Sequence, residues 1–89
     1  MKRKPIDLNG IESLNARSAA LLVQEACKYT ARILIEQGSK VVNAKSLMGV
    51  LSLSSKSTDS LYLVLDGEDE DDAYTAIADL IRERFTASA

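Results

Sequence analysis

Two places in this sequence combine polar residues in a way that suits phosphate: Asn15 with Arg17, and Ser46. Asn15 precedes a helical pattern, so its side chain is expected to accept a backbone N–H group as an N-cap. Arg17 would lie in the first turn, where open N–H groups and a guanidinium can bind an anion. A capped helix with a solvated arginine is the simpler interpretation, and spacing alone favours it.

Ser46 follows Lys45 at the predicted start of a short helix. A hydroxyl at this position is most often a helix cap. It is also a favourable site for phosphorylation, because a charge of about −1.5 to −2 would meet the positive end of the helix. The residues alone leave both interpretations open and favour the cap.

Three apolar residues follow Ser46 within the same short helix: Leu47, Met48 and Leu51. A helix this short cannot bury every apolar side chain, and methionine is common at adaptable binding surfaces. They therefore predict an apolar contact surface beside Ser46, with burial in the core as the alternative.

The residue counts exclude most catalytic chemistry. The chain has 89 residues, one cysteine and no histidine. It can form no histidine-based zinc site, no Ser-His-Asp or Cys-His pair and no internal disulfide. We therefore expect no enzyme activity, cofactor or metal. Cys27 falls in an apolar helical stretch and is expected to be a buried structural thiol.

Composition predicts a single globular domain over residues 1–89, with 46% apolar residues, 27% charged residues and a net charge of −2. No apolar stretch approaches a membrane span, and no apolar segment follows the basic start as in a secretory signal. We expect a cytoplasmic protein without membrane contact. The mild acidity argues against direct nucleic-acid binding.

Apolar periodicity predicts a helix over residues 16–29 and a last helix opened by the acidic residues 68–72. The first has an apolar stripe of Ala19, Leu22, Val23, Ala26 and Cys27. The last has the apolar face Ala73, Ile77, Leu80, Ile81 and Phe85, with Arg82 and Arg84 at its end. The acidic run is interpreted as a helix start that complements the dipole, with a partner-binding patch as the alternative.

Strands are predicted over residues 5–8, 31–36, 41–43 and 61–65, with a turn at 37–40 that makes the middle two a hairpin. Pro5 indicates either that the first strand lies at a sheet edge or that the strand starts at this residue. An edge strand would be open to pairing with another chain or to exchange between chains. The order is β-α-β-β-α-β-α. This predicts an α+β fold: a four-stranded, mainly antiparallel sheet with three helices on one face.

Three segments resemble the HPr family, the small phosphocarrier proteins of the bacterial sugar phosphotransferase system. Residues 42–49, Val-Asn-Ala-Lys-Ser-Leu-Met-Gly, resemble the family's regulatory-serine segment, and residues 67–70 resemble the start of its last helix. Residues 14–24 resemble its active-site helix. The resemblance extends from Ile6 to Ile81 and implies an HPr-like open-faced β-sandwich.

The resemblance fails at the phosphocarrier position. Asn15 replaces the family's phosphorylated histidine and Ser18 replaces its proline, whereas Ala16 and Arg17 are kept. An amide nitrogen is not basic and cannot take phosphate as an imidazole does. The sequence is therefore similar to the histidine-less catabolite-repression HPr paralogue (Crh) type, which keeps only the regulatory serine.

For the regulatory-serine segment, the resemblance implies phosphorylation of Ser46 by HPr kinase/phosphorylase. The phosphoprotein would then bind catabolite control protein A, a LacI-type repressor, as corepressor. The implied partner-binding residues are Arg17, Lys45, Leu47, Met48 and Leu51. The alternatives are a diverged interaction module without phosphorylation and a residual phosphocarrier. The sequence leaves the oligomeric state open, with a homodimer through the open strand edge as one alternative.

Overall fold

The computed structural model describes residues 1–6, 16–53 and 61–81. Its elements are β1 (Lys2–Ile6), α1 (Ala16–Ala26), β2 (Arg32–Gln37), β3 (Lys40–Asn43), α2 (Leu47–Leu51), β4 (Leu61–Asp66) and α3 (Glu70–Leu80). This is the predicted β-α-β-β-α-β-α order. Among the residues named in the sequence analysis, the structure does not describe Asn15, Arg82, Arg84 and Phe85, nor does it describe Leu8, the last residue of the predicted first strand.

The sheet has four strands in the order β1-β4-β2-β3, and every neighbouring pair is antiparallel. β2 and β3 form the predicted hairpin. β1 is an edge strand, which is one of the two positions that Pro5 predicts, because proline has no backbone N–H group to donate to a second neighbouring strand. The strand begins at Lys2, earlier than the sequence pattern indicated.

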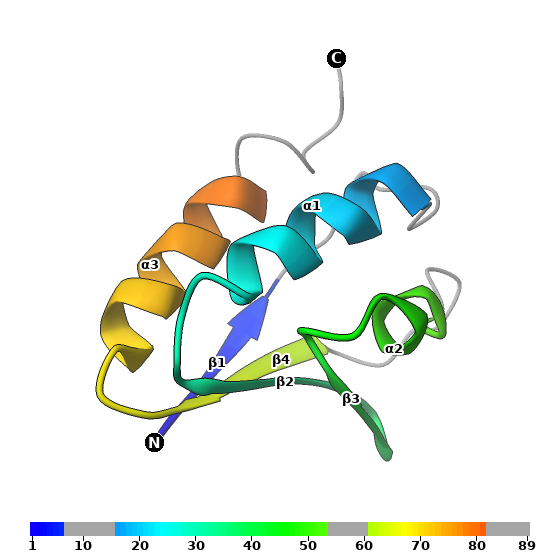
Figure 1. Cartoon of the computed structure of the whole chain (residues 1–89). Coiled ribbons are helices and arrows are strands. Elements are labelled where there is room, and N and C mark those ends of the chain that lie inside the picture. Colours follow the sequence, from blue (N-terminus) through cyan, green and yellow to red (C-terminus); the bar gives the residue numbers. More distant parts are fainter. Residues whose placement is uncertain (7–15, 54–60, 82–89) are drawn as a thin grey trace.

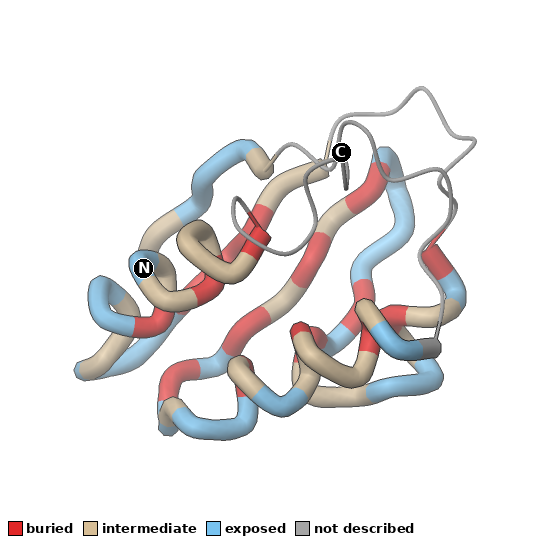
Figure 2. The backbone as a smooth tube through the Cα atoms, turned by 90° about the horizontal axis from the view of Figure 1, so that it is seen from above, coloured by how far each residue is buried: buried red, intermediate tan, exposed pale blue. Residues whose placement is uncertain are grey.

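The three helices cover one face of the sheet, as predicted (Figure 1). Side chains of a strand alternate between faces, so Ile33, Ile35 and Gln37 of β2 are buried beneath the helices. Leu34 and Glu36 lie on the other face and are only partly buried. Figure 2 shows this alternation as a change of burial from one residue to the next along the strand.

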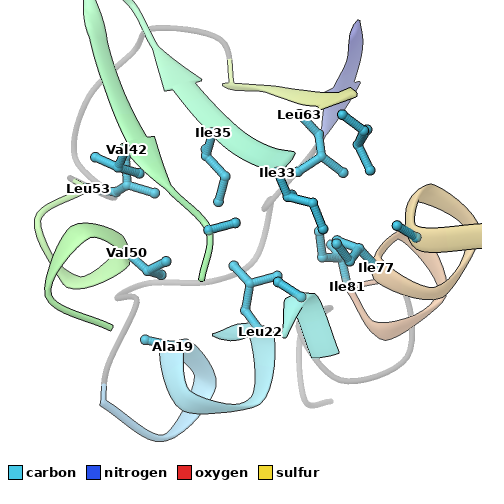
Figure 3. Packing of buried hydrophobic residues seen from close by; sticks show 14 of the residues in the cluster. Ala19, Leu22, Ile33, Ile35, Val42, Val50, Leu53, Leu63, Ile77 and Ile81 are labelled. Carbon is cyan, nitrogen blue, oxygen red and sulfur yellow. The ribbon is translucent and has the colours of Figure 1, made fainter. Parts of the chain in front are cut away.

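The core lies between the sheet and the helices. Leu22 of α1, Ile35 of β2, Leu63 of β4 and Ile77 of α3 are each at most 2% exposed and point toward one another (Figure 3). A fully buried side chain of this size contributes about 1.5–3 kcal/mol. Val50 of α2 joins the same cluster, so the short helix is fastened to the core by one fully buried side chain.

The prediction of a buried thiol at Cys27 is wrong: the residue is exposed. It follows Ala26, which is fully buried, by one position, and one residue is about 100° around a helix. Cys27 therefore lies on the flank of the apolar stripe and not at its centre. α1 also ends at Ala26, before the predicted limit of Tyr29.

The last helix keeps its predicted apolar face where the structure describes it. Ala73, Ile77 and Ile81 are buried and Leu80 packs against the core.

Among the helices that the structure describes, none combines the length and the apolar character that a membrane span requires.

Candidate regulatory site around Ser46

Ser46 is the N-cap of α2, as predicted. Its backbone is extended (φ −112°, ψ 117°), and its Oγ accepts a hydrogen bond from the Gly49 backbone nitrogen at 3.2 Å. Its carbonyl oxygen accepts from the Val50 nitrogen at 2.9 Å. The serine is only partly buried. Its hydroxyl therefore caps the start of the helix, in a residue that solvent reaches only in part.

The turn before Ser46 is held by Asn43, the last residue of β3. Its carbonyl oxygen accepts from the Ser46 nitrogen at 3.0 Å, and its Oδ1 accepts from the Lys45 nitrogen at 2.9 Å. Ala44 is fully buried and donates its N–H group to the Ile33 carbonyl of the neighbouring strand. A short polar side chain that bonds two residues along the chain is typical of such turns. The sheet thus determines where Ser46 lies.

Lys45 reaches away from Ser46 toward the end of α1. Its Nζ donates to the carbonyl oxygen of Tyr29 at 2.7 Å. Its own carbonyl oxygen lies 4.0 Å from the Sγ of Cys27. The resemblance implies that Lys45 binds a partner, and this stays a prediction; in the unmodified chain its ammonium bonds to Tyr29.

Lys40 makes a similar contact at the other end of α2, where its Nζ donates to the Ser52 carbonyl at 2.7 Å. A cation at a helix C-terminus satisfies carbonyls that lack a partner in the helix. The sequence analysis missed this residue, because Lys40 precedes the carbonyl that it caps by 12 positions.

The apolar residues of α2 point in two directions. Met48 is 78% exposed and Leu47 is 40% exposed. Leu51 packs partly against the core. The alternative that all of them are buried is therefore wrong for Leu47 and Met48, which form an apolar surface beside Ser46.

Arg17 is exposed in the first turn of α1. Asn15 lies outside the described residues, so its predicted cap stays a prediction. Figure 1 shows α2 lying beside α1, with both helices on the same side of the sheet.

The acidic run at the start of α3 bonds mainly within the chain. Asp69 is the N-cap residue of α3, but its side chain makes no capping hydrogen bond to the helix. Its carboxylate accepts from the backbone nitrogens of Thr30 and Ala31, both at 2.8 Å. The hydrogen bond from Thr30 is the main cause that lowers the pKa of Asp69 below its ordinary value.

Two further carboxylates hold the chain's first residues. Glu70 lies 3.3 Å from the N-terminal amine, and Asp71 lies 2.7 Å from the Nζ of Lys2. Glu70 also accepts from the Gly67 nitrogen, and this bond is the main cause that lowers its pKa. These contacts favour the structural interpretation of the acidic run over a partner patch.

Comparison with known proteins agrees with this fold. The family model described as the PTS HPr component phosphorylation site matches residues 3–83. The chain belongs to the HPr family.

Among its relatives, the chain is similar to the HPr-like protein Crh of Halalkalibacterium halodurans, at 41% identity over 93% of this chain and 99% of the relative. Proteins of this kind are phosphocarriers or regulators and not enzymes, and the same holds for this chain.

Two solved structures resemble the fold. HPr-C-His from Thermoanaerobacter tengcongensis superposes with a TM-score of 0.85 at 41% identity, over 96% of both chains. Crh of Bacillus subtilis superposes with a TM-score of 0.71 at 37% identity, over 93% of this chain and 95% of that one. That Crh structure is described as an intertwined dimer with a swapped domain.

Proposed function

We propose that this chain is a regulatory HPr-like protein that is switched by phosphorylation of Ser46. The kinase would be HPr kinase/phosphorylase, and the phosphoprotein would bind a LacI-type catabolite control regulator as corepressor. The observation that carries the proposal is the position of Ser46: this partly buried serine is the N-cap of α2, and Met48, two residues further on, is exposed. Both partners act in the cytoplasm, where we expect this chain to work.

The electrostatics of the site favour a phosphate. Replacing the hydroxyl hydrogen of Ser46 with a phosphoryl group adds about −1.5 to −2 charges and strong acceptor oxygens. The Gly49 N–H group already donates to this side chain. A dianion at the surface is also a feature that arginine or lysine of a partner can recognise.

The apolar surface beside Ser46 supplies the second half of the proposed interface. Exposed Leu47 and Met48 would be buried by a regulator that binds the phosphate, so binding would combine charge with hydrophobic contact. Arg17 is exposed in the first turn of α1, which packs beside α2, and we propose that it contributes to the same interface. Leu51, which packs partly against the core, would contribute less.

The test is incubation with purified HPr kinase/phosphorylase and ATP, followed by intact-mass measurement. We expect one phosphate per chain, lost in Ser46→Ala and retained in Ser52→Ala. Ser52 is a matched control, because it is an exposed serine at the opposite end of α2. An unmodified wild-type chain, or a labelled Ser46→Ala variant, would contradict the proposal.

The two alternatives give different results. A diverged interaction module would capture the same partner whether or not Ser46 is phosphorylated. A residual phosphocarrier would accept label from enzyme I and phosphoenolpyruvate. We expect no such label, because Asn15 stands at the phosphohistidine position and the chain has no histidine.

The proposal extends to a homodimer. β1 is an edge strand, and the Crh relative forms a dimer by exchange of a domain. Pairing or exchange at this edge would satisfy the backbone groups that an edge leaves open. Analytical ultracentrifugation should show a dimer at micromolar concentrations; a monomer at every concentration would exclude this part of the proposal.

A further inference from the structure

We propose that Lys45 is a positioning residue for Ser46: its ammonium, bonded to the Tyr29 carbonyl beyond the end of α1, holds the turn that presents the serine. The link to phosphorylation rests on the proposed function. The structural role of Lys45 is a property of the unmodified chain and can be tested without a kinase.

The Tyr29 carbonyl is a suitable anchor. Near the end of α1, Lys28 and Tyr29 donate only to residues three positions earlier, at 3.2 and 3.3 Å. Tyr29 lies three residues beyond Ala26, the last residue of α1, so its carbonyl faces a donor from another part of the chain. The Lys45 Nζ lies 2.7 Å from the Tyr29 oxygen, which is a short, charge-assisted hydrogen bond. It joins the end of α1 to the start of α2.

The backbone of Lys45 is fixed at the same junction. Its N–H group donates to Asn43 Oδ1, and its carbonyl oxygen faces the Sγ of Cys27. The next peptide bond leads directly to Ser46, whose own N–H group donates to the Asn43 carbonyl. If the Lys45 side chain lost its anchor, the turn would keep its contacts with β2 and β3 and the long contact with Cys27 Sγ, and Ser46 would move more freely relative to α1.

Position matters for phosphoryl transfer, because the attacking oxygen must lie in line with the transferred group. A misplacement of about 1 Å can reduce the rate by about 100-fold. A lysine that positions Ser46 should therefore affect kcat. A lysine that binds the kinase should affect KM.

The chain offers a matched control in Lys40. It makes the same kind of contact, Nζ to a backbone carbonyl at 2.7 Å, but at the far end of α2. Lys45→Met and Lys40→Met both remove one positive charge and keep most of the side-chain length. Only the first removes the bond to α1.

The decisive measurement is amide hydrogen exchange of the unmodified proteins at Ser46 and Gly49. In Lys45→Met we expect exchange at both amides to be about threefold to tenfold faster, since one charge-assisted hydrogen bond is lost. Lys40→Met should match the wild type at these amides. Lys45→Arg should restore slow exchange, because a guanidinium can donate to the same carbonyl. Circular dichroism should show that all variants are folded.

Kinase kinetics then separate positioning from docking. We expect Lys45→Met to lower kcat about threefold to tenfold with less than a twofold change in KM, and Lys45→Arg to recover most of the loss. Unchanged exchange in Lys45→Met, or an equal effect of Lys40→Met, would overturn the positioning role. So would a raised KM with unchanged kcat. If the wild-type chain is not phosphorylated, the proposed function fails, and hydrogen exchange alone decides the role of Lys45.

Discussion

The Oδ1 of Asp69 lies 2.8 Å from the backbone nitrogen of Ala31, a residue 38 positions earlier in the chain. Its other oxygen accepts from Thr30 at the same distance. One carboxylate thus fastens the start of α3 to the segment between α1 and β2. The same segment carries the Tyr29 carbonyl that accepts a hydrogen bond from Lys45. The hydrogen bonds of Asp69 and of Lys45 therefore reach the same stretch of backbone.

We expect Asp69→Ala to lower the free energy of unfolding, because two backbone N–H groups lose their acceptor. The free energy of unfolding of Asp69→Asn should fall between those of the wild type and Asp69→Ala, since an amide keeps one acceptor oxygen. Urea unfolding measures the change. Asp72→Ala is the control, because Asp72 is exposed in the same first turn. Equal stability of the Asp69 and Asp72 variants would contradict the assigned role.

The stability of the fold should depend on pH through the same carboxylate. The folded state lowers the pKa of Asp69 below its ordinary value of 3.8. The Asp69 carboxylate therefore binds fewer protons in the folded state than in the unfolded state. The stabilisation is therefore fully present above that value and is lost as the pH falls through the lower pKa of the folded state. Unfolding curves from pH 6 to about pH 2 should show a weaker acid dependence in Asp69→Asn than in the wild type. Parallel curves would exclude this contribution.

Gly67→Ala should destabilise the fold by about 1–3 kcal/mol. Gly67 has a φ of 157°, and a Cβ at this position would lie 2.6 Å from the Cα of Ala31. Gly49→Ala is the matched control: its added Cβ would have its nearest neighbours at 3.4 Å. Alanine is also favoured over glycine within a helix by about 0.5–1 kcal/mol. In thermal unfolding, Gly67→Ala should lower the melting temperature, and Gly49→Ala should raise it or lower it clearly less.

Cys27 should react with a thiol reagent in the folded protein, because it is exposed on the flank of α1. We expect complete labelling under native conditions, at a rate that denaturant raises only modestly. Cys27→Ser should change the free energy of unfolding by less than about 0.5 kcal/mol, as is usual for surface substitutions. Labelling that requires unfolding would contradict the exposed position.

Met48→Ala should weaken binding of the phosphorylated chain to the catabolite control regulator by about tenfold, and should leave stability unchanged. Met48 is 78% exposed, so truncation removes a surface contact without opening the core. Val41→Ala is the control, since Val41 is also an exposed apolar residue, on β3 and outside α2. Equal affinity of Met48→Ala and wild type would exclude Met48 from the interface.

The sequence by itself determined the element order and the cap at Ser46. Apolar periodicity is a local property, and each helix and strand has to bury its own apolar face. The Ser46 cap is local too, because the hydroxyl bonds a residue three positions ahead. The missing histidine and the motif at residues 42–49 likewise depend only on residue type and spacing.

The tertiary structure decided the contacts between distant residues. The bond from Lys45 to Tyr29 spans 16 positions and that from Thr30 to Asp69 spans 39. Neither follows from local spacing, because each depends on how two elements approach after the sheet has formed. Cys27 shows the same limit: spacing assigned it to the apolar stripe, but where a helix meets its neighbours decides which flank stays exposed.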